Sequence, residues 1–279
     1  MNKRLMFSAA LVMALLSANA QKRAFTIEDL YRVKGLSSVS LSPDGKTVCY
    51  TASSSDLKSQ KSGSDIYIMN ADGSHTKALT EDGKSSSAVW SKDGKSIFFT
   101  NNEKGTAQIF RMDLTTCETE QVTDYELGIG SPVISPDERY IAFTAEVYPD
   151  LGADAKANKA RMEKKEQGPV QAHIADKLLY RHWTSYNDGR CNHLILFDTQ
   201  TKTYKDLTPG NYSLIFVVGG GITYQFSPDS KEICFVSNHD EHQEASTNAD
   251  LWTVSVNGGR TGLHHEGEQG LGWYSCLFA

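Results

Sequence analysis

A short turn-forming phrase recurs along this chain and restricts its fold more than any other feature. The phrase reads Ser-Pro-Asp-Gly, Ser-Lys-Asp-Gly, Ser-Pro-Asp-Glu and Ser-Pro-Asp-Ser, with its acidic residue at Asp44, Asp93, Asp137 and Asp229. The first two steps are 49 and 44 residues, and the last step is 92 residues. Since the last step equals about two of the others, one unit is either degenerate or carries an insertion.

A second pattern shares this period. Residues 65–80, 108–123 and 193–208 each contain an alternating apolar strand, a turn and a second strand that ends in Leu-Thr or Val-Thr, and residue 250 begins the pattern a fourth time. In the recurring phrase, Pro presets the backbone of a turn, and Gly or a small residue accepts a left-handed conformation. The apolar runs that follow the phrase are typical of buried strands.

Units of this length with about four short strands are typical of β-propeller blades. We therefore predict an all-β fold over residues 21–260, an incomplete β-propeller of about five four-stranded blades with TolB- or WD40-like repeats. An ordinary β-sandwich with similar hairpins is the alternative, but the period that the two patterns share favours the propeller. Residues 153–169 are rich in Ala, Lys and Glu and end in Gly-Pro, which predicts a short polar helical insertion.

The two ends of the chain differ from the repeats. Residues 1–20 combine an early positive charge, a short apolar stretch and small residues before a predicted cleavage between Ala20 and Gln21. This pattern predicts a signal peptide, a secreted or periplasmic location and no membrane span after its removal, with an uncleaved anchor as the alternative. Thr26 precedes a predicted short helix. Residues 261–279 lack the recurring phrase, and we expect them to be an aberrant tail produced by a frameshift. For this reason His264, His265 and Cys276, which lie in that tail, carry no functional argument.

The composition and motifs exclude several functional classes. The net charge is −6 without a long basic run, so no nucleic-acid partner is expected. The sequence has no Gly-x-Ser-x-Gly elbow, no His-Glu-x-x-His, no phosphate-binding Gly loop and no paired Cys-x-x-Cys. We therefore assign no catalytic residue, no cofactor and no metal ligand. Among the five cysteines, Cys49 and Cys234 stand in strand-like runs and are predicted to behave as small buried apolar residues.

Two polar stretches remain as candidate sites. Arg181, His182 and Trp183 follow a strand-like Leu-Leu-Tyr and could line a pocket, or could combine an aromatic packing position with surface charge. A second stretch has the side chains of a metal site, but no diagnostic ligand spacing, and we favour a solvated loop. Its residues are His239, Asp240, Glu241, His242 and Glu244.

Several longer segments together resemble the N-terminal propeller of prolyl oligopeptidase family serine peptidases, of the dipeptidyl-peptidase-V and acylaminoacyl-peptidase type. The resemblance covers about residues 24–260. Its more specific segments read LLYRHW, DGRCNHLILFD and SNHDEHQEASTNADLW, whereas single Ser-Pro-Asp-Gly phrases also occur in TolB-like propellers.

The resemblance implies a function for this region. In that family the propeller covers an α/β-hydrolase domain and restricts the access of peptides, and the Ser-Asp-His triad lies in the hydrolase domain. We therefore expect a substrate-gating propeller whose catalytic domain is absent from this chain, inactive alone and prone to self-association through unpaired blade edges. Peptides would be the substrates of the longer parent. The paired glutamates that hold a substrate amine in some relatives have no clear counterpart motif here. The alternative is a periplasmic TolB-like binding propeller without enzymatic activity.

Overall fold

The structure of the chain is a computed structural model, which describes residues 23–175, 178, 180–214, 223–240, 242–246 and 248–263. The predicted cleavage site at Ala20 and Gln21 lies outside these residues, as do His264, His265 and Cys276. No helix in the described part of the chain is long and apolar enough to cross a membrane.

Four antiparallel four-stranded sheets, here called the first to fourth blades, form the described fold. The first blade has β1 (Gly35–Leu41), β2 (Thr47–Asp56), β3 (Lys61–Asn70) and β4 (Lys77–Ala78). The second has β5 (Ser85–Trp90), β6 (Ser96–Asn101), β7 (Gln108–Asp113) and β8 (Thr119–Gln121). The third has β9 (Gly130–Ile134), β10 (Tyr140–Val147), β13 (Cys191–Asp198) and β14 (Thr203–Asp206). The fourth has β15 (Tyr224–Phe226), β16 (Glu232–Ser237), β17 (Asp250–Ser255) and β18 (Gly262–Leu263).

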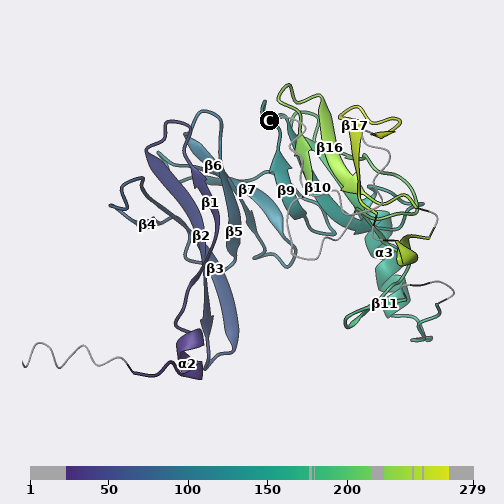
Figure 1. Cartoon of the computed structure of the whole chain (residues 1–279), viewed down its shortest axis with the longest axis horizontal. Coiled ribbons are helices and arrows are strands. Elements are labelled where there is room, and N and C mark those ends of the chain that lie inside the picture. The colour runs from purple at the N-terminus through teal and green to yellow at the C-terminus, as the bar shows by residue number, and fades with distance from the viewer. Residues whose placement is uncertain are drawn as a thin grey trace, which may run out of the picture.

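The blades follow one another in a row, with the first and fourth at opposite ends, so the propeller is incomplete (Figure 1). About five blades were expected, and the described residues form four. The long step between Asp137 and Asp229 is therefore explained by an insertion and not by a degenerate blade. Residues 148–190 leave the third blade after β10 and return at β13, and the two strands still pair directly over their full lengths.

The insertion contains a helix and a small hairpin. Helix α3 (Ala155–Glu166) begins after Asp154, whose carboxylate accepts a hydrogen bond from the Ala157 N–H at 3.0 Å. The hairpin consists of β11 (Arg181–His182) and β12 (Ser185–Tyr186). The predicted helical insertion is thus confirmed, as is the short helix after Thr26, which is α2 (Ile27–Leu30). A 3-10 turn, η2 (Gln243–Ala245), lies between β16 and β17. Figure 1 shows α2 and the insertion extending from the same side of the row of blades.

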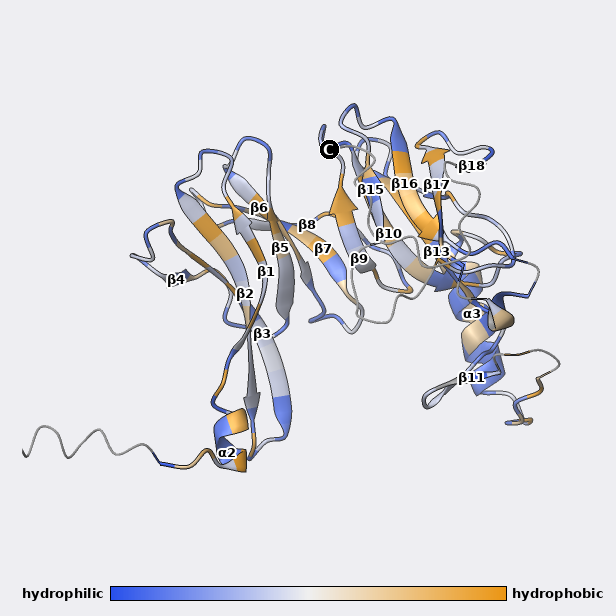
Figure 2. Ribbon diagram, in the orientation of Figure 1, coloured by the Kyte–Doolittle hydropathy of each residue, from blue (hydrophilic) through white to orange (hydrophobic). Residues whose placement is uncertain are grey.

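Apolar side chains fill each boundary between neighbouring blades. Figure 2 shows apolar stretches along β2, β7 and β16, within their respective sheets. A blade can bury both faces of its sheet only where another blade packs on each side. Three hydrophobic clusters follow from this rule, one at each boundary. The first and second blades share Cys49, Ile66, Ile97 and Phe99; the second and third share Phe98, Ile109, Phe143 and Phe197; and the third and fourth share Leu194, Leu196, Ile233 and Phe235.

The recurring phrase has the same structural role in all four blades. Its Ser hydroxyl donates to the Asp carboxylate three times at 2.7 Å and once, between Ser135 and Asp137, at 2.6 Å. The same hydroxyl accepts the N–H of the residue five positions later, Tyr140 in the third blade, at 2.9 Å. The final residue of the phrase has a positive φ, which Gly adopts without strain and which Glu138 adopts at 60°. The phrase therefore builds turns.

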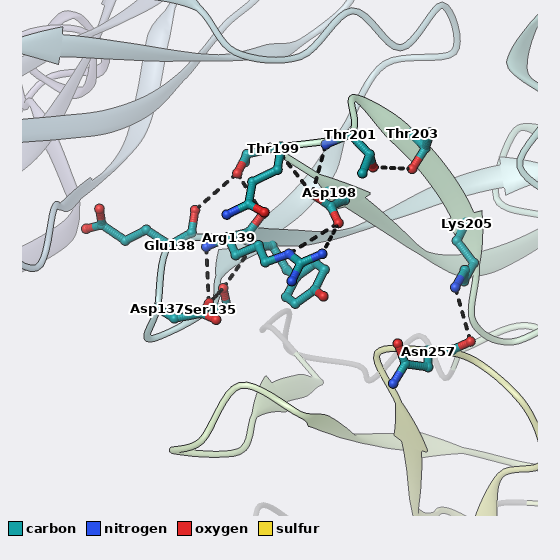
Figure 3. A network of polar contacts seen from close by, with 12 residues as sticks. Ser135, Asp137, Glu138, Arg139, Asp198, Thr199, Thr201, Thr203, Lys205 and Asn257 are labelled. Atoms are coloured by element: carbon teal, nitrogen blue, oxygen red, sulfur yellow. Dashed lines mark hydrogen bonds and ion pairs between the residues drawn. The ribbon is translucent and has the colours of Figure 1, made fainter.

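In the third blade this turn also connects to the neighbouring hairpin (Figure 3). Arg139 donates to the Asp198 carboxylate at 2.9 Å, and the Thr199 hydroxyl donates to the Arg139 carbonyl at 2.8 Å. Further along the same face, Lys205 donates to the Asn257 carbonyl of the fourth blade at 3.1 Å. These contacts stabilise the outer turns.

Two cysteines are part of the packed sheets, as predicted. Cys49 has no exposed surface and Cys234 is 6% exposed. Burial raises the pKa of the Cys49 thiol to about 12 and that of the Cys234 thiol to about 11. Both thiols are therefore protonated and unreactive at neutral pH.

Candidate functional site

The candidate site is a cavity of about 590 Å³ beside the insertion, here called the acidic cavity. It lies where α3 crosses the ends of the second and third blades. Five segments line it: the residues before β7, the loop into β9, the end of β10, one side of α3 and the start of β13. The lining residues are Thr106, Ala107, Glu126, Leu127, Gly128, Ile129, Gly130, Thr144, Ala145, Glu146, Lys159, Met162, Glu163, Glu166, Arg190 and Asn192.

Asn158 attaches α3 to Tyr148, the first residue after β10 of the third blade. Its side chain is fully buried; its carbonyl oxygen accepts the Tyr148 N–H at 2.6 Å, and its amide donates to the Gly152 and Asp154 carbonyls at 3.0 and 2.8 Å. A buried amide that satisfies several backbone groups holds the helix in one orientation. Residues of α3 that follow Asn158 at helical spacing then lie on one side of the helix and line the cavity: Lys159, Met162, Glu163 and Glu166.

The floor of the cavity is backbone that approaches the sheet closely. A Cβ atom at Gly130 would lie 2.6 Å from the Thr144 hydroxyl oxygen, so only glycine fits there. The Ile129 N–H donates to the Ala107 carbonyl at 3.0 Å. Nearby, the fully buried Tyr125 donates its hydroxyl to the Ala153 carbonyl at 3.2 Å, which connects the floor to the start of the insertion. These contacts hold the floor in place.

Four glutamates and two cations line this cavity. Arg190 forms ion pairs with Glu146 at 3.0 Å and with Asp188 at 2.9 Å, so the charge of Glu146 is compensated. Glu126, Glu163 and Glu166 form no ion pair with any residue that the structure describes. Glu126 is half-buried, and the other two are exposed on α3. The arrangement attracts a positively charged group, and its carboxylates can accept the hydrogen bonds of an ammonium.

The sequence-predicted pocket residues lie elsewhere in the insertion. Arg181 is exposed on β11, and Trp183 is 83% exposed at the hairpin turn with a φ of 49°. His182 is part of β11 and pairs with Ser185 through the backbone. None of the three is a lining residue of the acidic cavity.

His239, from the predicted polar loop, is an aromatic packing residue. Its ring stacks on Trp252, with the two ring centroids 3.9 Å apart. The centroid of the Tyr212 ring lies 4.0 Å from that of His239. Burial lowers the pKa of His239, which favours the neutral ring.

The sequence did contain a signal for the acidic cavity. Within the charge run at 153–169, Glu163 and Glu166 stand three positions apart, so they share one side of α3. Glu126, which lines the same cavity, lies in the loop between β8 of the second blade and β9 of the third. No pattern in the sequence relates that loop to the helix, because only the fold of the insertion brings the two together.

Two family models match the chain. The model described as TolB beta propeller domain matches residues 21–167. The model described as dipeptidyl peptidase IV N-terminal region matches residues 153–279.

Individual proteins are similar over most of this chain. Dipeptidyl-peptidase 5 of Porphyromonas gingivalis is 29% identical over 246 residues, which cover 86% of this chain and 35% of that protein. Dipeptidyl-peptidase 5 of Porphyromonas endodontalis is 26% identical over 258 residues, which cover 90% of this chain and 36% of that protein. The structure of Pyrococcus horikoshii acylaminoacyl peptidase superposes with a TM-score of 0.59 at 18% identity, covering 86% of this chain and 34% of that one. The chain thus spans about a third of the length of these relatives.

Proposed function

Since this chain belongs to the TolB beta propeller domain family and is an N-terminal propeller region of the dipeptidyl peptidase IV and acylaminoacyl peptidase family, we propose that it admits and positions peptides for a secreted serine exopeptidase. The parent enzyme would remove short units from peptide amino termini through an acyl-enzyme. Most of each relative's length lies beyond the part that this chain matches. We therefore assign bond cleavage to residues outside this sequence, and a secreted or periplasmic location on the pattern of residues 1–20.

The acidic cavity is the observation that carries this proposal. A peptide amino terminus is a compact cation with up to three hydrogen-bond donors, and the three glutamates without an ion pair supply acceptors for it. A cavity of about 590 Å³ has the size of an ordinary ligand site and holds more than one amino-acid residue. A peptide chain that enters with its amino terminus at α3 would be held at a defined depth, which is what an exopeptidase needs.

Removing two of these charges is expected to weaken the binding of a free amino terminus. In the double variant Glu163→Gln and Glu166→Gln, we expect a short peptide to bind roughly 10-fold more weakly than to the original chain, since each exposed ion pair contributes about 1 kcal/mol or less. Isothermal titration calorimetry at low ionic strength measures this. The effect should shrink as salt is added, because both glutamates are exposed.

The control removes two exposed glutamates outside the cavity, with Glu81→Gln and Glu118→Gln, and should bind the peptide unchanged. An N-acetylated peptide lacks the positive charge and should bind equally weakly to all three proteins. Equal binding of the free and acetylated peptides to the original chain would contradict the proposed role of the acidic cavity.

A TolB-like binding propeller without enzymatic activity is the second candidate, and the TolB beta propeller match over residues 21–167 favours it. The two candidates differ in the surrounding gene. A downstream reading frame that encodes further blades and a Gly-x-Ser-x-Gly motif supports the peptidase, and its absence supports the binding propeller.

We also propose that the incomplete propeller self-associates through its first blade. Along β1, Leu36 is 66% exposed and Val39 is 65% exposed, where an interior blade would have a neighbour. Light scattering after gel filtration should show mass that increases with concentration. The variant Leu36→Ser and Val39→Ser should shift the protein towards the monomer, whereas Leu57→Ser, at an exposed position on the β2–β3 turn, should not. A concentration-independent monomer would contradict the proposal.

A further inference from the structure

A smaller cavity of about 300 Å³ lies at the boundary between the first and second blades, here called the Lys84 cavity. It occupies the strand ends where β2 turns into β3 and β6 turns into β7, so it is the counterpart of the acidic cavity one blade boundary earlier. Both cavities are lined by Ala107, which makes them direct neighbours. Its polar lining includes Ser62, Ser64, Ser86, Thr100 and Asn102 together with Lys84.

The backbone of Lys84 is held from three directions. Its N–H donates to the Asp82 carboxylate at 2.8 Å, its carbonyl accepts the Asn102 N–H at 3.3 Å, and it forms a parallel bridge with Ser64. The two strand ends approach closely because Gly63 has no side chain, and a Cβ there would lie 2.8 Å from the Gly83 carbonyl oxygen. The base of the Lys84 side chain is therefore fixed at the rim of the cavity.

Many residues that line the Lys84 cavity carry side chains that can donate hydrogen bonds. Lys84 forms no ion pair with any residue the structure describes, and no Asp or Glu lines the cavity. Within the described chain, the Ser64 hydroxyl and the Asn102 side-chain amide have no hydrogen-bond partner, whereas Ser86 and Thr100 bond to each other at 2.9 Å. Residues that carry an ammonium, a hydroxyl and an amide thus line one cavity, and donors of this kind suit a carboxylate.

The charges of the two neighbouring cavities are opposite, and so are the two ends of a peptide. We propose that the Lys84 cavity binds the C-terminal carboxylate of a short peptide whose amino terminus lies in the acidic cavity. This inference rests on the proposed function, because it takes the acidic cavity as the site of the amino terminus. The peptide crosses at Ala107, and the fixed positions of α3 and Lys84 on separate blade boundaries select its length.

Calorimetric titration of the whole chain with alanine peptides tests this. The series runs from dipeptide to hexapeptide, and each length is prepared as the free acid and as the C-terminal amide, with a free amino terminus in both. At the length that spans the two cavities, we expect the acid to bind about 5-fold more tightly than the amide, the size of one favourable exposed charge contact. At shorter lengths the acid and the amide should bind alike.

Lys84→Gln should abolish the difference between acid and amide while leaving the binding of the amide unchanged. The matched control is Lys58→Gln, which removes the same charge from the exposed β2–β3 turn outside both cavities and should keep the difference. Thermal melts of the three proteins establish that the fold is retained. Equal binding of acid and amide at every length overturns the inference, as does a difference that persists in Lys84→Gln.

Repeating the titration with N-acetylated peptides separates this inference from the proposed function. If N-acetylation weakens binding but amidation has no effect, the acidic cavity keeps its role and the Lys84 cavity loses its own. If the acid is preferred through Lys84 while N-acetylation has no effect, the proposed function fails, and so does the length selection built on it. No binding of any peptide contradicts both.

Discussion

Replacing Phe143 with alanine is expected to lower the free energy of unfolding by about 3–5 kcal/mol. The Phe143 ring has no exposed surface and lies at the boundary between the second and third blades. Its centroid is 5.2 Å from that of Tyr125 and 6.2 Å from that of Tyr204, both in edge-on arrangements. The substitution removes these contacts and leaves a cavity that rigid strands on both sides cannot fill.

Urea denaturation followed by circular dichroism measures this loss as a lower midpoint at an unchanged slope. The control is Phe25→Ala, since Phe25 is 66% exposed before the first blade and its loss should cost less than about 0.5 kcal/mol. A Phe143→Ala variant as stable as the original chain would show that the second and third blades do not share one core.

The protein is expected to lose stability between neutral and alkaline pH through His193. This ring is completely buried; its Nδ1 lies 2.8 Å from the Asp206 carboxylate and its Nε2 lies 2.9 Å from the Gly210 carbonyl oxygen. Burial by itself would lower the pKa of His193, but the hydrogen bond to Asp206, with smaller contributions from other neighbours and from the Asp206 charge, raises it to about 9. Both nitrogens then donate, and the folded protein holds a proton that the unfolded chain releases near pH 6.5.

Because the folded pKa is above the unfolded one, the stabilisation is complete below about pH 6.5 and decreases as the pH rises to about 9. The expected decrease in the free energy of unfolding is roughly 3 kcal/mol. Urea titrations across this pH range measure it. In His193→Gln the decrease should be absent, while His75→Gln, at an exposed position, should retain it. A decrease of the same size in both variants would assign it to other groups.

Local chemistry made the blades predictable from the sequence. The Ser and Asp of each recurring phrase bond within their own turn, so the same few residues produce the same turn wherever they occur. The alternating strands that follow carry their own pairing pattern, and the buried Cys49 and Cys234 follow from it. Helix α3 was equally predictable, since Ala, Lys and Glu favour a helix and Gly-Pro ends one.

The number of blades was less predictable, because the chain can lengthen a unit without adding a sheet. β10 and β13 pair over eight residues although more than forty residues separate them in the sequence. The spacing of the recurring phrase is compatible with either a degenerate blade or an insertion. The direct pairing of β10 with β13 in the third blade shows that it is an insertion.

What the sequence by itself determined is the repeated four-stranded unit, its turns, the helical insertion and the resemblance to peptidase propellers. Only the tertiary structure decided where the charges meet. The buried amide of Asn158 orients α3, and this brings Glu163 and Glu166 to the loop that carries Glu126. Lys84 lines the neighbouring cavity at the place where Gly63 lets two strand ends approach closely. Such sites depend on contacts between residues distant in the chain, and short-range patterns carry no information about those contacts.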